Sequence, residues 1–345
     1  MIEETIAQYE LSAAEVEHIR EGAARLAASL TDPTAPRGYD DERTRFADAA
    51  LPPRLRQFLE AFRRTESSAG LLVHGFPVDD TAVGPTPEHW EQVAGPGTTL
   101  EQEVFLAMCA TALGDPFTFS TLQLGRMIQN ILPIRGDEQR QSGHGSETLL
   151  EFHTEDGFHP GRCDYLMLFG IRNHDRVPTI LASVRDVKLS DEDIDALTRP
   201  DFEIMPDDEH VRQLQLRYPD HPALARVEEM QRNPVAVPVL FGDRERPYLR
   251  IDLPFMRVVE NRPRAERALH ALMAELERVQ HSVVVEQGSL LVVDNYLAVH
   301  GRKPFEVRYD GTDRWLKRMI VSRDLRKAAQ AGATGGLPGS GRVVF

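Results

Sequence analysis

The chain has 345 residues, 41% of them hydrophobic and 27% charged, which is the composition of an ordinary soluble globular protein with a large core. Its formal net charge of −14 disfavours nucleic acid or an anionic membrane surface as a partner. No apolar run reaches the roughly 18–20 residues of a membrane span. The acidic residues 1–4 lack the features of a secretory signal. We therefore expect a cytoplasmic protein in which Cys109 and Cys163 are reduced, buried thiols.

The first third of the chain is predicted to be mainly helical. Residues 11–30 alternate apolar and charged side chains at helical spacing, with Ser12 as a cap. Residues 53–65 begin with a proline, which the first turn of a helix tolerates. Residues 100–113 form a more apolar, buried helix. Between these helices, the apolar run at 70–76 is bounded by glycine and proline and predicts a strand.

From residue 117 onward, short strands and turns replace the helical pattern, and regular strand–helix alternation is missing. Helices are expected to begin at residue 190 and to span 264–281. The polar segments 135–147 and 206–233 are candidate lids, with ordinary surface loops as the alternative. Strands are expected at residues 127–134, 148–154, 165–171, 179–184, 282–286, 289–293 and 315–322, and a hairpin at 235–241 and 247–252.

A His-x-Glu motif stands at the end of one predicted strand, in Phe152-His153-Thr154-Glu155-Asp156. Residues two apart in an extended segment point to the same side, so His153 and Glu155 present an imidazole and a carboxylate together. His300, from the end of a neighbouring strand, can supply a second imidazole. Two histidines and one carboxylate that leave other metal positions open are the arrangement of non-haem Fe(II) oxygenases.

The motif alone does not decide the function. Twelve histidines and 54 acidic residues in 345 give about two chance matches. The second match, His89 and Glu91, lies in a Pro/Gly-rich stretch and is interpreted as a structural loop or helix start. His74 is likewise interpreted as a core or edge histidine. A mononuclear zinc hydrolase and a non-catalytic, cupin-like metal-binding protein are the alternatives.

Two arginines share one face of the predicted C-terminal strand. In an extended segment Arg314 and Arg318 point to the same side. A guanidinium binds a carboxylate through two hydrogen bonds and keeps its charge, so two such groups near a metal suit a site for two carboxylates. The alternative is a solvated basic strand that pairs with Asp310 and Asp313.

Four motifs in the chain resemble the clavaminate synthase-like Fe(II)/2-oxoglutarate-dependent oxygenases. They are Phe-His-Thr-Glu-Asp-x-Phe-His-Pro at 152–160, Val-Asp-Asn at 293–295, Val-His-Gly-Arg at 299–302 and Arg-Tyr-Asp-Gly-Thr-Asp-Arg-Trp-Leu-x-Arg at 308–318. The resemblance covers roughly residues 65–325. Within that group it is strongest to the hydroxylases of free amino acids such as arginine, asparagine and lysine.

The resemblance implies an α+β fold with a distorted double-stranded β-helix, or jelly roll, as its core, carrying N-terminal and inserted helices. Residues 1–65 would form a helical region packed on this core. Residues 66–325 would form the oxygenase domain, with a helical or lid insertion at about 190–233. Residues 326–345 would be a tail, and its Gly/Ser-rich part at 332–341 is expected to be frayed.

The resemblance also assigns roles in the site. His153, Glu155 and His300 would hold Fe(II). Arg314 would bind the distal carboxylate of 2-oxoglutarate, and Thr179 would be a further contact of this co-substrate.

The remaining roles concern the substrate. Arg318 would bind the α-carboxylate of an amino acid, and Gln123 and Glu155 would contact its α-amino group. Asp252 would bind the end of its side chain, with an ordinary surface charge on a hairpin as the alternative. The arginine hydroxylases of the group place a second acid two residues after the first, where this chain has Pro254. A single carboxylate suits an ammonium, a ureido group or an amide better than a guanidinium.

The expected reaction is therefore O₂-dependent hydroxylation of the β or γ carbon of a free L-amino acid with a basic, amide or ureido side chain. 2-Oxoglutarate would be converted to succinate and CO₂. A carrier-bound or non-amino-acid substrate, and a desaturation, are the alternatives within the same chemistry. The sequence leaves the amino acid, the stereochemistry and the oligomeric state open.

Overall fold

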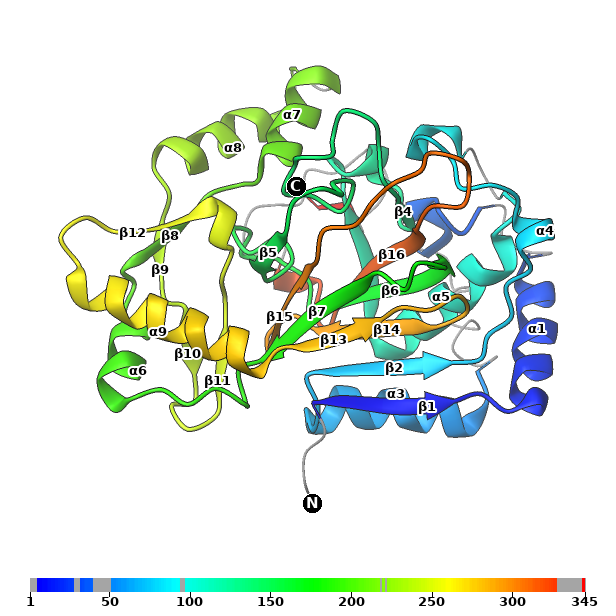
Figure 1. The fold of residues 1–345 in the computed structure, drawn as a ribbon, viewed down its shortest axis with the longest axis horizontal. Coiled ribbons are helices and arrows are strands. Elements are labelled where there is room, and N and C mark those ends of the chain that lie inside the picture. The colour runs from blue at the N-terminus through cyan, green and yellow to red at the C-terminus, as the bar shows by residue number, and fades with distance from the viewer. Residues whose placement is uncertain are drawn as a thin grey trace.

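The strands of the chain form two main sheets, which lie near the middle of Figure 1. The structure is a computed structural model that describes residues 5–27, 32–39, 51–93, 97–217, 219–220, 222–327 and 343–344. The larger sheet has the strand order β1-β2-β14-β6-β16-β3-β17, with β4 also paired to β16. These strands are β1 (Ile6–Glu10), β2 (Gly70–His74), β3 (Asp115–Phe119), β4 (Gln129–Ile131), β6 (Tyr165–Arg172), β14 (Leu290–Asp294), β16 (Trp315–Ser322) and β17 (Val343–Val344).

The smaller sheet has the order β13-β7-β15-β5 and lies against the larger one. It consists of β5 (Leu150–His153), β7 (Pro178–Ser183), β13 (His281–Val284) and β15 (Ala298–Arg302). Apolar side chains from both sheets, such as Leu168 and Leu316 from the larger and Leu181 and Val299 from the smaller, belong to one buried cluster. Two facing sheets of this kind form the double-stranded β-helix that the sequence predicts.

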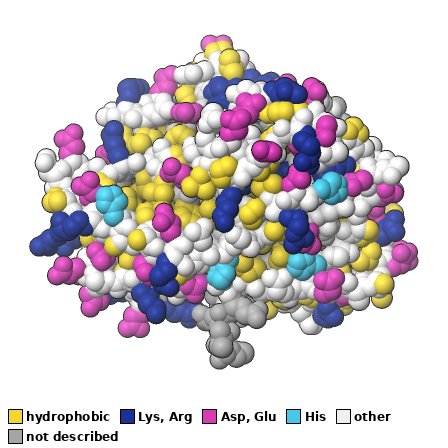
Figure 2. All heavy atoms as spheres, in the orientation of Figure 1, with side chains coloured by type: hydrophobic (Ala, Val, Ile, Leu, Met, Phe, Trp, Pro, Cys, Tyr) yellow, Lys and Arg dark blue, Asp and Glu magenta, His cyan; other side chains and the backbone are white. Residues whose placement is uncertain are grey.

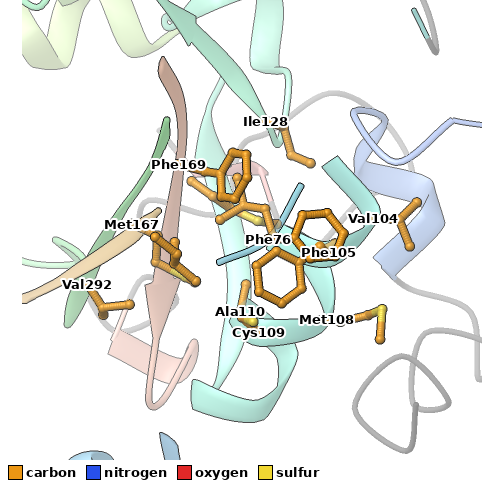
Figure 3. Close-up of a cluster of buried hydrophobic side chains, with 14 of the residues drawn as sticks. Phe76, Val104, Phe105, Met108, Cys109, Ala110, Ile128, Met167, Phe169 and Val292 are labelled. Carbon is orange, nitrogen blue, oxygen red and sulfur yellow. The ribbon is translucent and has the colours of Figure 1, made fainter. Parts of the chain in front are cut away.

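Three helices cover the outer face of the larger sheet: α1 (Ala13–Ala27), α3 (Pro53–Thr65) and α5 (Leu100–Leu113). Helix α5 is buried on nearly all sides, and Phe105 on this helix stacks on Phe76 with ring centroids 4.2 Å apart (Figure 3). Phe169 of β6 packs edge-on against both rings. At the start of α1, the Glu15 N–H donates to Ser12 Oγ, which confirms the predicted cap.

The inserted elements gather at the open side of the smaller sheet, on the left and at the top of Figure 1. Helices α6 (Asp191–Leu197) and α9 (Pro263–Val279) pack on each other and on β7. Helices α7 (Asp208–Arg217) and α8 (Pro222–Arg232) share a small apolar cluster of their own. The other elements are β8 (Phe202–Ile204), β9 (Ala236–Val237), β12 (Met256–Val258), the hairpin β10 (Leu240–Gly242) and β11 (Pro247–Leu249), α4 (Asp80–Val83), and the 3₁₀ turns η1 (Pro36–Tyr39), η3 (Trp90–Gln92), η4 (Gln123–Gly125) and η5 (Leu253–Phe255).

Several sequence predictions need correction or completion. The N-terminal region is not purely helical, because β1 pairs in parallel with β2 and extends the larger sheet. The strand predicted at 127–134 is reduced to β4, which is only three residues long. Cys109 and Cys163 are free and buried, as expected. The predicted frayed segment 332–341 lies outside the described residues.

Acidic and basic side chains are interspersed over the face of the molecule drawn in Figure 2. Among the helices that the structure describes, none is both long and apolar enough to cross a bilayer.

Candidate active site

The two predicted histidine ligands face each other on neighbouring strands of the smaller sheet. β5 and β15 are antiparallel, and His153 is the direct cross-strand partner of His300. Their ring centroids lie 4.2 Å apart. The Glu155 carboxylate is 3.2 Å from His300 Nε2. One potential ligand atom from each of the three residues lies within 4.8 Å of the other two, which is the spacing of a shared metal site.

A turn positions Glu155. The alternation of side chains along a strand, which was expected from the sequence, does not. β5 ends at His153, and Glu155 lies in the turn that follows. The side chain of Asn295 fixes this turn, because its Oδ1 accepts the Glu155 N–H at 2.7 Å and its Nδ2 donates to the Glu155 carbonyl at 3.0 Å. The same Nδ2 donates to the carbonyl of Cys163 at 3.0 Å. One buried amide thus sets the place of the acidic ligand.

His300 also occupies a different place from the predicted one. It was expected near the end of the strand at 289–293, but β14 ends at Asp294 and the chain then turns into the other sheet. His300 stands inside this new strand, β15. Gly301 is required beside it, because a Cβ at this position would lie 2.4 Å from the carbonyl oxygen of Leu150. The close approach accompanies a register shift between β15 and β5 next to His300.

The protonation states of His153 and Glu155 suit a divalent metal. His153 Nδ1 lies 2.8 Å from the carbonyl oxygen of Glu151, so Nδ1–H donates there and Nε2 keeps its lone pair for a metal. Burial, with a further contribution from His300, lowers the pKa of His153 to about 4, so the ring is neutral at pH 7. Burial alone would raise the pKa of Glu155, but Arg318 and the two histidines hold it well below its ordinary value.

A cavity of about 470 Å³ opens beside this triad, between the two sheets and the inserted segments. It brings together every candidate site residue named from the sequence. Its lining includes His153, Glu155, His300, Arg314, Thr179, Arg318, Asp252 and Gln123. The other His-x-Glu pair is structural, as predicted: His89 accepts the Glu91 N–H through Nδ1 at the start of η3.

One end of the cavity carries arginines without acidic partners. We call Thr179, Arg302 and Arg314 the arginine end. Arg314 is 7% exposed, and its Nε has no hydrogen-bond partner among the described residues. Burial, together with the charge of Arg302, lowers the pKa of Arg314 to about 9. The alternative of a solvated strand paired with Asp313 is therefore wrong, since Asp313 instead accepts the backbone N–H groups of two other residues.

Arg318 also lines the cavity, beside the triad, and already has acidic partners. It contacts the Glu155 carboxylate at 2.5 Å and Asp156 at 3.7 Å, and it also donates to the side chain of Gln129. Gln123 also lines the cavity. It stands in the turn η4 with a φ of 44°, in the left-handed region. The amide of Gln123 exchanges two hydrogen bonds with the backbone of Asn130, at 2.8 and 2.9 Å.

The opposite end of the cavity carries two carboxylates: Asp252 has no cationic partner in the described part of the chain, and Asp207 lies 3.9 Å from Nε2 of His210. We call Asp207 and Asp252 the acidic end. Asp252 forms an isolated bridge with His153 on the side of β5 that faces away from β15. It is 6% exposed, so it is not a surface charge of the hairpin. Burial and three neighbouring carboxylates raise the pKa of Asp252 well above its ordinary value. Arg318 and His210 pair with these neighbours, but no basic side chain in the described ranges pairs with Asp252 itself.

Two acidic-end features were not found from the sequence. Asp207 stands just before α7 and lines the cavity from the inserted segment. His210 is fully buried behind it, with Nε2 3.0 Å from Asp156 Oδ1 and Nδ1 in contact with Thr121. Both residues lie in the polar segment 206–233, whose composition gave no periodic signal that could place its side chains relative to the triad.

Comparison with known proteins agrees with this geometry. The family model described as "Taurine catabolism dioxygenase TauD, TfdA family" matches residues 59–320. The chain belongs to this family. It is 41% identical to an enduracididine beta-hydroxylase of Streptomyces hygroscopicus, over 85% of this chain and 88% of that protein. It is 39% identical to an L-ornithine/L-arginine 3-hydroxylase of Catenulispora acidiphila, over 81% of this chain and 84% of that protein.

A solved structure of the non-heme iron oxygenase OrfP, in complex with Fe, succinate and (3S)-hydroxy-L-Arg, matches with a TM-score of 0.89 and 36% identity. The match covers 98% of this chain and 99% of OrfP. Other OrfP structures hold Fe with alpha-ketoglutaric acid, or Fe with L-homoarginine. The clavaminate synthase-like family and the double-stranded β-helix fold expected from the motifs are therefore confirmed, and the chain is a non-haem Fe(II)/2-oxoglutarate oxygenase of the amino-acid hydroxylase type.

The residues present fit the cofactor and co-substrate of this TauD/TfdA family member. Two imidazoles and one carboxylate would supply three metal ligands and would leave adjoining metal positions free for a bidentate 2-oxo acid and O₂. The buried Arg314, whose Nε has no partner among the described residues, suits an anion such as the distal carboxylate of 2-oxoglutarate.

Proposed function

We propose that this protein hydroxylates the β or γ carbon of a free L-amino acid with a cationic, arginine-like side chain. The single observation that carries this proposal is the charge pattern of the cavity. Among the described residues, Arg302 and Arg314 at the arginine end have no acidic partner and Asp252 at the acidic end has no cationic partner, and the two ends lie on opposite sides of the metal triad. The strand order supports this placement: Thr179 is on β7, His300 on β15 and His153 on β5, and Asp252 lies beyond β5.

In the proposed complex, His153, Glu155 and His300 hold Fe(II), and Arg314 and Thr179 bind the distal carboxylate of 2-oxoglutarate. Bound Fe(II), 2-oxoglutarate and O₂ supply the oxidising chemistry that breaks an unactivated C–H bond and yields succinate and CO₂.

The substrate is held by this chain's side chains at both of its ends. Arg318 binds the α-carboxylate, and Gln123 and Glu155 contact the α-amino group. Asp252 binds the cationic end of the side chain. Charged anchors at both ends fix which carbon faces the metal, because they remove the rotational freedom of the chain between them.

Asp207 supports a cationic side chain despite Pro254. Pro254 and Asp207 both line the cavity, so a second carboxylate is available from the inserted segment instead of from η5. A guanidinium could then contact Asp252 and Asp207 with different nitrogen atoms. This geometry offers a guanidinium the second carboxylate that is missing at Pro254. The relatives named for arginine, ornithine and enduracididine also support a basic substrate.

The test is a substrate screen with a matched neutral partner. Fe(II)-loaded protein is incubated with 2-oxoglutarate and with arginine, ornithine, lysine, homoarginine, asparagine or citrulline. Citrulline is the matched control, because it has nearly the shape of arginine without the charge. We expect succinate and a product heavier by one oxygen with a cationic amino acid, at a rate at least about tenfold above citrulline. Preference for citrulline, or a product lighter by two hydrogens, would contradict the proposal.

A further inference from the structure

Arg302 is a second buried arginine in the cavity with donors that no described residue accepts. It is 3% exposed and lines the cavity wall. Its Nη1 donates to the carbonyl oxygens of Lys303, at 2.9 Å, and Ser146, at 3.4 Å. Its Nε and Nη2 are buried and have no partner in the described part of the chain. The ring of Phe305 lies 4.9 Å from the guanidinium carbon.

The sheet register places Arg302 beside the co-substrate residues. Arg302 and His300 are two residues apart on β15, so both side chains point into the cavity. Across the antiparallel pair, Arg302 stands opposite Thr179 of β7, as His300 stands opposite Leu181. Arg314 reaches the same region from the facing sheet, just before β16. The positive charge of Arg302 contributes to the lowered pKa of Arg314, so the two guanidinium groups interact.

Two neighbouring buried cations without an acid are unfavourable unless an anion binds them. The same protein supplies such a partner where a buried cation is structural. Lys317 lies on β16 and, three residues after Arg314, points to the opposite face of the sheet. It is fully buried and contacts the Glu103 carboxylate at 2.7 Å. No acid plays this part for Arg302 or Arg314 among the described residues. A carboxylate can accept hydrogen bonds from both groups, because it has about four lone-pair positions.

We propose that Arg302 is a second co-substrate-binding residue, which shares the distal carboxylate of 2-oxoglutarate with Arg314 and makes the site selective for a 2-oxo diacid over a 2-oxo monoacid. This inference rests on the proposed function. One carboxylate would then bind two guanidinium groups. Each would donate hydrogen bonds that the other is not placed to donate.

The test compares two 2-oxo acids that share the metal-binding end. 2-Oxoglutarate carries the distal carboxylate and 2-oxobutyrate lacks it. Binding of each is measured by isothermal titration calorimetry on Mn(II)-loaded protein without O₂, so that no turnover takes place. The variants are R302Q, which removes the charge, and R302K, which keeps it. K303Q is the matched control, because it removes one positive charge from the adjacent, exposed position.

In the wild type, 2-oxoglutarate should bind much more tightly than 2-oxobutyrate. R302Q should reduce this affinity ratio about tenfold through weaker binding of 2-oxoglutarate alone, R302K should restore part of the ratio, and K303Q should leave it unchanged. A purely structural role of Arg302 predicts that both affinities fall together and the ratio stays constant, which would overturn the inference. Should R302Q fail to fold, R302K decides by the same ratio. A wild-type protein that binds neither acid would instead overturn the proposed function.

Discussion

The two ends of the cavity solve the same electrostatic problem with opposite signs. At the arginine end, Arg302 and Arg314 are buried without a carboxylate partner among the described residues. At the acidic end, Asp252 is buried without a cationic partner in the same part of the chain, and neighbouring carboxylates raise its pKa further. Arg318, which contacts the triad, is paired with Glu155 and Asp156. The charges that lack an opposite partner at the two ends indicate where ligands of opposite sign bind.

The largest effect is expected where the two ends meet, at the metal. His153→Ala removes one of three ligands, so turnover should be lost and the stabilisation of the protein by Mn(II) against heat should disappear. Thermal unfolding with and without Mn(II) measures this. His89→Ala, in the other His-x-Glu pair, is the control and should change neither property. An H153A protein with wild-type metal affinity would show that the triad is not the metal site.

The next largest effect is expected from a substitution that removes a cation from the arginine end only. Arg314→Ala should raise the 2-oxoglutarate concentration needed for half-maximal succinate formation about 100-fold, because a bidentate charged contact is lost. The affinity for the amino acid should stay within about twofold of the wild type. Kinetics at varied concentrations of each ligand separate the two affinities. Equal losses for both ligands would mean that the two ends do not act independently.

A smaller effect, confined to the acidic end, is expected for Asp252→Asn. The variant should bind a cationic amino acid about tenfold more weakly, while its affinity for citrulline should hardly change. Since the amide does not carry a buried, unpaired charge, the melting temperature should not fall. Asp243→Asn, on the exposed turn of the β10–β11 hairpin, is the matched control. A uniform loss for arginine and citrulline would contradict the role of Asp252.

The smallest effect concerns Asp294, a buried carboxylate outside the cavity lining, and the pH dependence of stability that it causes. Burial raises the pKa of Asp294 to about 7, although its Oδ1 accepts the N–H groups of Tyr296 and Leu297. The folded state therefore binds this proton more tightly than the unfolded state, so stability falls as pH rises from about 4 to about 7. Asp294→Asn keeps the acceptor without the charge and should flatten this dependence, with a gain on the order of 2 kcal/mol at pH 8. Thermal unfolding at pH 5 and pH 8 tests this prediction, and parallel pH profiles would refute it.

The sequence was sufficient to predict the chemistry of the site but not its backbone. His153, His300 and Arg314 were found because their motifs combine residue types that few other sites need together. Glu155 was found for an incomplete reason: strand alternation was assumed, whereas a turn held by Asn295 places it. That contact joins residues 140 positions apart, which no local pattern reports.

The same limit explains the missed elements. Strand β1 forms because it pairs with β2, more than 60 residues later, and not because its own pattern is distinctive. Arg302 was recognised as part of a motif, but its burial and its neighbours depend on the register of β15 with β7. Asp207 reaches the cavity only through the way the α7–α8 insertion folds back.

The contact between the two candidate lids has a consequence for substrate traffic. Arg140, in the loop at 135–147, lies 3.3 Å from Glu209 at the start of α7, and both side chains are partly exposed. Ion pairs in such surroundings contribute no more than about 1 kcal/mol. Breaking this one ion pair therefore costs little free energy. Passage of substrate and product between the loop at 135–147 and helix α7 need not limit the rate at which the enzyme turns over.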